Sequence, residues 1–215
     1  MELPKFTLLC VWLVSSTATA AEITMERPAS PDTDTLILGG RRVQDASAWP
    51  STFKFGKGTE EFCTATAVGP RVILTAAHCL PDNATGHVVV NGARSKIVCN
   101  HHPHYTPCPT SDAEFANPGT CPAGKTTSAD YALCLTDAAL PIASFERVNV
   151  TATLPEPTSV VTLTGYGCNK DGGVDNGFGY LFEGDTEVQA VPIEGNVSGW
   201  NSYYITTKGN AALCY

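Results

Sequence analysis

The 215-residue chain has few charged residues and no cluster of positive charge. Charged side chains make up 16% of the sequence, and 13 Lys and Arg against 21 Asp and Glu give a formal net charge of -8. Binding to nucleic acid or to an anionic membrane surface favours clustered Lys or Arg, so we expect neither kind of partner. Hydrophobic residues make up 43% of the chain, a composition that can bury a sizeable core.

Long helical patterns, internal repeats and low-complexity tracts are also absent from the sequence. No long apolar pattern recurs with the period of an α-helix, about 3.6 residues. Short β-type runs recur instead, separated by turn residues such as Gly69-Pro70 and Asn91-Gly92. The sequence therefore predicts an all-β fold in two sandwiches or barrels. The strand-like runs are 52–55, 65–68, 72–74, 87–90, 96–98, 131–133, 159–163, 187–191 and 203–206.

The N-terminus lacks an apolar run long enough to cross a membrane. Lys5 precedes an apolar run over 6–14, and the small residues at 18–20 complete the pattern of a secretory signal peptide. A spanning helix would need about 20 apolar residues. We therefore expect residues 1–20 to be removed and the protein to be secreted and extracellular, without a membrane anchor.

Pro, Asp, Glu and Thr dominate residues 21–36, which show no apolar periodicity. We interpret this stretch as an exposed, mobile propeptide. A second Pro-marked stretch, over 140–157, interrupts the strand-like runs and marks the expected domain boundary. We assign residues 37–150 to a first β-barrel and residues 151–215 to a shorter second one.

Cysteine usage favours disulfides over metal sites. One of the nine cysteines, Cys10, falls in the signal peptide, and the other eight are an even number in an exported protein. The histidines at 101–104 have no second ligand pair at metal-site spacing, so we interpret them as a surface loop and predict no metal and no cofactor. Cys99 and Cys134 each end a strand-like run, which makes a cross-strand bridge between them reasonable. Cys108 and Cys121 could then close the loop between those runs, leaving Cys168 with Cys214, although sequence alone allows many connectivities.

Five short motifs carry a family resemblance. His78 follows a β-type run and two alanines, and Cys79 beside it lies close enough in sequence to Cys63 for the two to close one loop. The span 37–215 resembles the trypsin/chymotrypsin-like serine endopeptidases, whose motifs it repeats in order. The matching segments are Ile37-Leu38-Gly39-Gly40, Ala48-Trp49-Pro50, Thr75-Ala76-Ala77-His78-Cys79, Asp130-Tyr131-Ala132-Leu133 and Thr164-Gly165-Tyr166-Gly167.

The resemblance implies two antiparallel β-barrels and a Ser-His-Asp triad that hydrolyses peptide bonds. A serine hydroxyl is a poor nucleophile at neutral pH, so an imidazole must accept its proton and a carboxylate must orient that imidazole. By resemblance His78 is the general base and Asp130 the orienting carboxylate. The family also bridges its histidine loop as Cys63 to Cys79 would. It usually pairs the cysteine before its nucleophile segment with one beyond it, which would leave both Cys168 and Cys214 without their usual partners here.

In the family the nucleophile lies in a Gly-Asp-Ser-Gly-Gly segment, which would follow Cys214-Tyr215 here. No comparable glycine-flanked turn surrounds Ser111, Ser128, Ser159, Ser198 or Ser202. We therefore expect this chain to be truncated before the nucleophile, with an incomplete second barrel and no activity as given.

Activation in the family creates a new N-terminus at the residue that matches Ile37. Leu36 precedes it in place of Arg or Lys, so we expect an activating protease whose specificity is not trypsin-like, or a different processing route. The sequence thus predicts a secreted serine endopeptidase zymogen that acts on protein or peptide substrates. The alternative is an inactive protease homologue that serves as a binding protein. The intact His78 and Asp130 favour the enzyme, because a protein that only binds has no chemical need for either residue.

Overall fold

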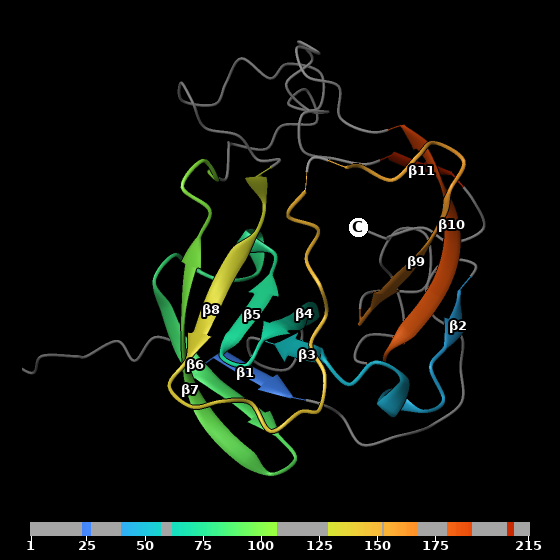
Figure 1. Ribbon diagram of the computed structural model, residues 1–215. Helices are drawn as coiled ribbons and strands as arrows, with labels where there is room; N and C mark the ends of the chain where they lie inside the picture. The colour runs from blue at the N-terminus through green and yellow to red at the C-terminus, as the bar shows by residue number, and fades with distance from the viewer. Residues whose placement is uncertain are drawn as a thin grey trace, which may run out of the picture.

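The computed structural model describes residues 23–26, 40–56, 62–106, 129–151, 153–166, 180–190 and 206–208. These residues form strands and two short 3-10 helices, and no α-helix occurs among them. The strands form two groups, a closed barrel that contains β1 and β3–β8 and a separate sheet that contains β2 and β9–β11 (Figure 1). The prediction of an all-β fold is confirmed.

The first barrel is closed by seven strands in the order β1-β3-β4-β5-β8-β7-β6. Every neighbouring pair is antiparallel except β1 and β6, which run parallel. Closure leaves none of these strands with an unpaired edge in the ring, which is how barrels avoid edge-to-edge association. The strands are β1 (Ile23–Glu26), β3 (Thr52–Gly56), β4 (Phe62–Gly69), β5 (Val72–Thr75), β6 (Ala84–Val90), β7 (Ala93–His101) and β8 (Ala132–Thr136).

Residue alternation and turn chemistry explain why these segments form strands. In β8, Ala132 and Cys134 are buried while Leu133 and Leu135 face outward. β6 and β7 are joined at Asn91-Gly92, whose φ angles of 49° and 78° suit the tight turn that matches strand twist. This turn was expected from the sequence, because Asn and Gly tolerate positive φ better than other residues.

The core of the barrel is filled by inward-facing apolar side chains. Phe53, Phe55, Ile73, Val88 and Ile97 are all 0–1% exposed. Full burial of such a side chain contributes roughly 1.5–3 kcal/mol. The barrel therefore has a core of its own, made by strands that lie far apart in the sequence.

One segment differs from its sequence-based interpretation. Ile23–Glu26 lies within the stretch that we expected to be exposed, yet it forms β1, with Ile23 only 2% and Met25 0% exposed. A four-residue alternation is too short to be recognised among acidic and Pro-rich neighbours, and the space between β3 and β6 decides its burial. The expectation of exposure was wrong for Ile23 and Met25, whereas Glu26 is exposed as expected and the assignment of 21–36 as a propeptide stays a prediction.

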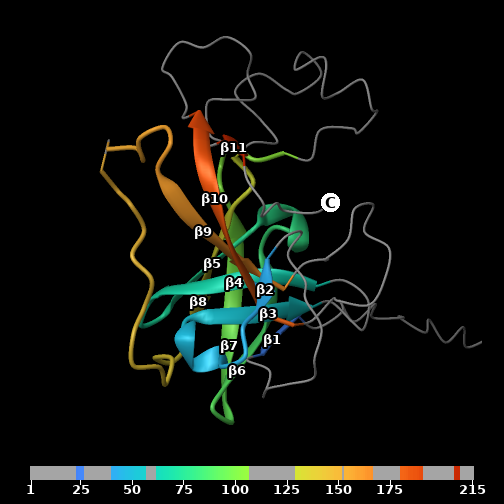
Figure 2. The ribbon, with the colours of Figure 1, turned by 90° about the vertical axis from the view of Figure 1, so that its right-hand side faces the viewer.

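The second group of strands is a partial sheet built around the nine-residue strand β10. β9 pairs with one edge of β10, while β2 and β11 pair with the opposite edge near its two ends (Figure 2). Tyr166 and Phe182 are fully buried, and Val188 is buried as well. The strands are β2 (Arg41–Arg42), β9 (Val160–Gly165), β10 (Phe182–Ala190) and β11 (Thr206–Lys208).

The two groups are joined by segments without strands. Residues 137–151 and 153–159 lead from β8 to β9, in the stretch where the sequence placed a boundary. The boundary at 150 itself stays a prediction. No helix among the described residues has the length and apolar character needed to cross a membrane.

Candidate active site

His78 lies at one end of the first barrel, on the short 3-10 helix η2 (Ala77–Cys79) that directly follows β5. Ala77 is fully buried and anchors this turn in the core. Thr75, the last residue of β5, donates a hydrogen bond from Oγ1 to the carbonyl oxygen of Thr64 on β4, at 2.9 Å. The turn therefore has fixed contacts on both sides, while the His78 side chain is 62% exposed.

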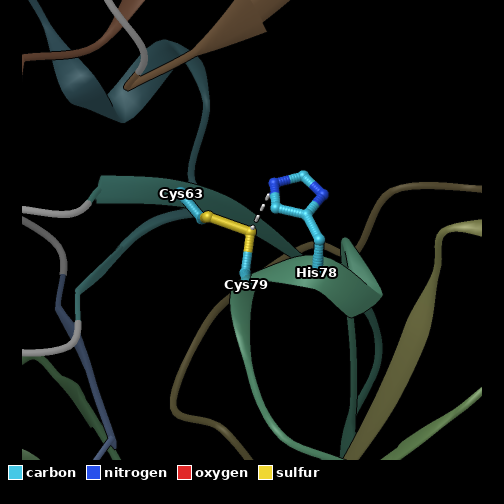
Figure 3. A group of neighbouring side chains, drawn as sticks. All are labelled: Cys63, His78 and Cys79. Atoms are coloured by element: carbon cyan, nitrogen blue, oxygen red, sulfur yellow. Dashed lines mark hydrogen bonds between the residues drawn. A yellow bond between two sulfur atoms is a disulfide. The ribbon is translucent and has the colours of Figure 1, made fainter. Parts of the chain in front are cut away.

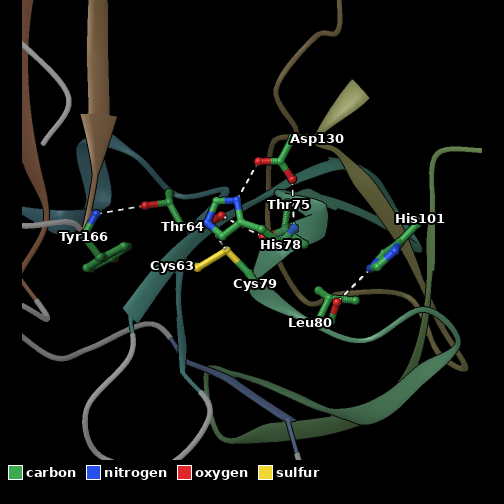
Figure 4. The surroundings of a disulfide bond; sticks show 9 residues. All are labelled: Cys63, Thr64, Thr75, His78, Cys79, Leu80, His101, Asp130 and Tyr166. Carbon is green, nitrogen blue, oxygen red and sulfur yellow. Dashed lines mark hydrogen bonds and ion pairs between the residues drawn. A yellow bond between two sulfur atoms is a disulfide. The ribbon is translucent and has the colours of Figure 1, made fainter. Parts of the chain in front are cut away.

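Asp130 reaches His78 because β5 and β8 are neighbours in the barrel. Thr75 pairs with Ala132, which places the residues just outside the two strands side by side. One carboxylate oxygen of Asp130, Oδ2, lies 2.5 Å from Nδ1 of His78, and the other, Oδ1, accepts the backbone N–H of His78 at 2.8 Å (Figure 4). The structure thus brings together two predicted site residues that are 52 positions apart.

The contact shifts the pKa of both groups in the direction of an ion pair. The hydrogen bond to Asp130, together with its negative charge, raises the pKa of His78 above its ordinary value of 6.5, against the opposing effect of burial. Burial raises the pKa of Asp130, but the hydrogen bonds from His78 outweigh it, so the pKa of this carboxyl falls below 3.8. Because Asp130 occupies Nδ1, the other ring nitrogen, Nε2, is the one that can exchange a proton with a substrate or nucleophile.

A disulfide lies directly against the imidazole. Cys63 on β4 is bonded to Cys79 on η2, and Sγ of Cys79 lies 3.4 Å from Nε2 of His78 (Figure 3). This is the pair that the family resemblance implied. The bridge ties the turn that carries His78 to β4, so this turn is held by a covalent bond as well as by the contact with Asp130.

A second disulfide joins Cys99 on β7 to Cys134 on β8, which are directly opposite each other in the strand register. This is the cross-strand pair that the sequence favoured. The remaining predicted site residues, namely Ile37, Cys108, Cys121, Cys168 and Cys214, lie outside the described residues.

Among the described residues, one group of three side chains has the proximity of metal ligands, and it consists of Cys63, His78 and Cys79. Its two sulfurs are joined in a disulfide, so neither is a thiolate, the form of cysteine that binds metals. Near it, His101 contacts the carbonyl oxygen of Leu80 through Nε2 at 2.7 Å.

Sequence reasoning missed the residue that connects the two halves next to this site. Oγ1 of Thr64 accepts the backbone N–H of Tyr166 at 2.9 Å, and Tyr166 is fully buried (Figure 4). Thr64 belongs to none of the five motifs, so no local signal pointed to it. The glycine motif of the second half is thereby docked against the strand that carries Cys63.

A second contact between distant segments forms around Glu183 on β10. Nε of Arg41 donates to Oε1 of Glu183, and the indole N–H of Trp49 donates to Oε2, both at 2.8 Å. These bonds, that of Trp49 first, hold the pKa of Glu183 below its usual value despite opposing burial. The three residues line a cavity of about 410 Å³ together with Gly40, Thr162, Gly184 and Asp185. Trp49 was identified only as part of a motif, and its partner came from the structure.

The chain is similar to known proteins in sequence pattern and in fold. A family model described as trypsin matches residues 37–178. The structure is similar to that of neuropsin, a serine protease expressed in the limbic system of mouse brain, with 19% identity and a TM-score of 0.50 over 70% of this chain and 64% of that one. It is also similar to human heparin binding protein, with 14% identity and a TM-score of 0.52 over 72% of this chain and 66% of that one. At these identities the likeness concerns the fold, and the chain spans slightly less than two thirds of the length of each.

Proposed function

The chain belongs to the trypsin family of serine proteases, and we propose that it is a secreted endopeptidase, made as a zymogen, in which His78 is the general base and Asp130 the orienting carboxylate. One observation carries the proposal. Asp130 binds His78 at both the ring Nδ1 and the backbone N–H, so the ring is held in one tautomer and one orientation. A general base requires that fixed geometry.

The chemistry follows from this contact. With Nδ1–H donated to Asp130, Nε2 of His78 carries the lone pair that takes the proton of an attacking serine hydroxyl. The same nitrogen then delivers the proton to the leaving amine when the tetrahedral intermediate breaks down. The raised pKa of His78 favours the imidazolium that forms between these steps, and the lowered pKa of Asp130 keeps its carboxylate ionised beside it.

We place the nucleophile outside the described residues. Among them, the partners of the His78 ring are Asp130 and Cys79, and neither is a serine. By family pattern the serine belongs to a segment that would follow Tyr215. If the serine lies beyond the 215-residue chain, that chain alone is expected to be inactive, because the proposed base then has no nucleophile to activate.

A serine-directed fluorophosphonate probe tests this proposal. We expect no labelling of the 215-residue chain, and labelling of a chain extended by the coding sequence after Tyr215 if that sequence continues in frame into Gly-Asp-Ser-Gly-Gly. In the extended chain, His78→Ala should abolish rapid labelling, whereas His104→Ala, at an exposed histidine outside the pair, should not change it. Labelling of the 215-residue chain, or full labelling of the His78→Ala variant, would contradict the assignment.

The same proposal includes where substrates bind and where the chain is cut for activation. Protein or peptide substrates would bind at the end of the first barrel where His78 is exposed, and an activating protease would cut between Leu36 and Ile37. Because Leu36 occupies the position before the cut, that protease would have to accept an apolar residue.

The second candidate is an inactive homologue that binds a partner. The similarity to human heparin binding protein is an example of this fold in a protein named for binding. A net charge of -8 does not favour a polyanion such as heparin as a ligand of this chain. A stop codon directly after Tyr215, combined with no labelling of the secreted protein, would favour this candidate over the enzyme.

A further inference from the structure

β1 completes the first barrel, although it precedes the site of the proposed activation cut. It lies between β3 and β6, antiparallel to the first and parallel to the second (Figure 1). Met25 is paired with Phe55 on one side and with Val88 on the other. Residues 23–26 therefore occupy the place at which the ring of strands would otherwise be open or would have to close directly.

The side chains of β1 fit this place. Ile23 and Met25 point into the core, where they are 2% and 0% exposed. On β6 the residue opposite Ile23 is Gly86, and a Cβ atom there would lie 2.3 Å from the carbonyl oxygen of Ile23. The absence of a side chain at Gly86 is thus what allows β1 to approach β6.

Opposite charges also face each other between β1 and β3 in this strand register. Glu26 at the end of β1 is directly opposite Lys54 on β3. Burial lowers the pKa of Lys54, and the charge of Glu26 opposes that shift. Opposite charges on directly facing residues stabilise a strand pair, and a slip by one residue would remove this contact and turn Met25 out of the core.

The residues on the two sides of Leu36–Ile37 are held by different sheets. β1 belongs to the first barrel, while β2, which starts at Arg41, pairs with β10 in the second sheet. Residues 21–36 contain no cysteine, so no disulfide can retain them after a cut.

We propose that residues 23–26 are a permanent strand of the first barrel, and that a cut between Leu36 and Ile37 yields a two-chain protein with the N-terminal piece bound noncovalently by β3 and β6. The piece acts as a structural subunit, and the gap between these strands is a binding site for an extended apolar peptide with Ile and Met at alternate positions. The proposal does not depend on catalytic activity, and its test uses an introduced protease.

The experiment replaces residues 32–36 of the full protein with a recognition sequence for a site-specific protease that cuts immediately before Ile37. After cutting, the protein is passed over a size-exclusion column and each peak is analysed by mass spectrometry. We expect the N-terminal piece to coelute with the main chain in buffer and to separate in concentrated guanidinium chloride. Separation in buffer would overturn the proposal.

A glycine pair provides a matched test of where the piece binds. Gly86→Ala places a methyl group against the backbone of β1 and should weaken retention about tenfold or more, judged from the dissociation of the piece on dilution. Gly69→Ala adds the same methyl group to β4, where its nearest neighbours lie 3.7 Å away, and should leave retention unchanged. Equal retention in the two variants would contradict the assigned site.

A second pair of variants covers the case in which Gly86→Ala fails to fold before the cut. Met25→Asp puts a charge into the core, and Thr24→Asp puts the same charge on the neighbouring half-exposed position of β1. We expect the piece to be lost after cutting in the first variant and retained in the second. Retention in both would show that burial of Met25 does not hold the piece, and would overturn the proposal.

Discussion

The first barrel and the second sheet differ in whether their strands form a closed unit. The first barrel closes its ring of strands and holds His78, Asp130 and both disulfides of the described residues. The second sheet is partial among those residues and contacts the site through the Tyr166 amide. His78 and Asp130 are therefore positioned by one half of the molecule alone. In the mechanism proposed above they still need a serine nucleophile, so the pair can be fully formed without being active.

The largest expected effect tests whether the barrel is the more stable half. Phe53→Ala removes a fully buried ring from the barrel core and should lower the free energy of unfolding by about 3–5 kcal/mol. Phe182→Ala in β10 removes the same fully buried ring from the partial sheet and should cost less, because fewer strands surround it. Urea unfolding measures both, with Leu135→Ala, at a residue 55% exposed on β8, as the control. Equal losses for Phe53→Ala and Phe182→Ala would contradict the difference between the halves.

The next effect tests whether the covalent link holds the turn that carries the base. Replacing both Cys63 and Cys79 by Ser opens a loop with a sequence separation of 16 residues. In the chain-entropy model such a bridge contributes about 3 kcal/mol to the free energy of unfolding. The measurement is the denaturant midpoint under non-reducing conditions. An unchanged midpoint would mean that Asp130 and the barrel core hold the turn without help.

A smaller effect tests the link between the halves. Thr64→Val removes the acceptor of the Tyr166 N–H and leaves that buried donor without its partner, at a cost of about 1–3 kcal/mol. Hydrogen exchange should become faster at Tyr166 and in β9, while exchange in the barrel core stays the same. Thr66→Val, two residues along the same strand, is the control. Equally faster hydrogen exchange in β5 and β8 would show that the two halves do not open independently of each other.

The smallest effect is the pH dependence of the pair within the barrel. The raised pKa of His78 stabilises the fold fully below pH 6.5 and ceases to do so as pH rises through the higher folded-state pKa. The lowered pKa of Asp130 stabilises it above pH 3.8 and ceases to do so as pH falls through the lower folded-state pKa. Between pH 3.8 and pH 6.5 the pair should therefore add at most about 1 kcal/mol to the free energy of unfolding, because His78 is largely exposed and solvent weakens the interaction.

Asp130→Asn should remove that gain and return the His78 pKa toward its ordinary value, because its first cause is the hydrogen bond to Asp130. Titration of the imidazole by NMR measures the shift directly, with the unsubstituted protein as the control. A His78 pKa that stays raised in the variant would show that another group is responsible.

Local motifs were enough to find the residues that later came together. His78 and Asp130 each lie in a short segment next to a β-type run, and Cys99 and Cys134 each lie at the end of one. The strand periods and the Asn91-Gly92 turn were similarly readable, because side-chain alternation and positive φ are local properties. The pairing of Cys63 with Cys79 came from the resemblance.

β1, the acceptor Thr64 and the Glu183 contacts had no such signal. β1 has only four residues, and its two apolar side chains can be recognised as core residues only once β3 and β6 are seen on either side of it. Nothing in the local sequence distinguishes Thr64 and Glu183 from other polar residues on strands. The contact of Thr64 with Tyr166, and the contacts of Glu183 with Trp49 and Arg41, appear only in the folded structure. Burial and pairing therefore had to be seen in the structure.

The sequence by itself determined the all-β character, the turns and the family, because these follow from neighbouring residues. Only the tertiary structure decided that residues 23–26 close the barrel and that Asp130 binds His78 at two points. The contact of Asp130 with His78 joins residues 52 positions apart, and the contacts of Tyr166 with Thr64 and of Arg41 with Glu183 join residues 102 and 142 positions apart. A local pattern is compatible with many strand pairings, and the closed ring with its shared core selects one of them.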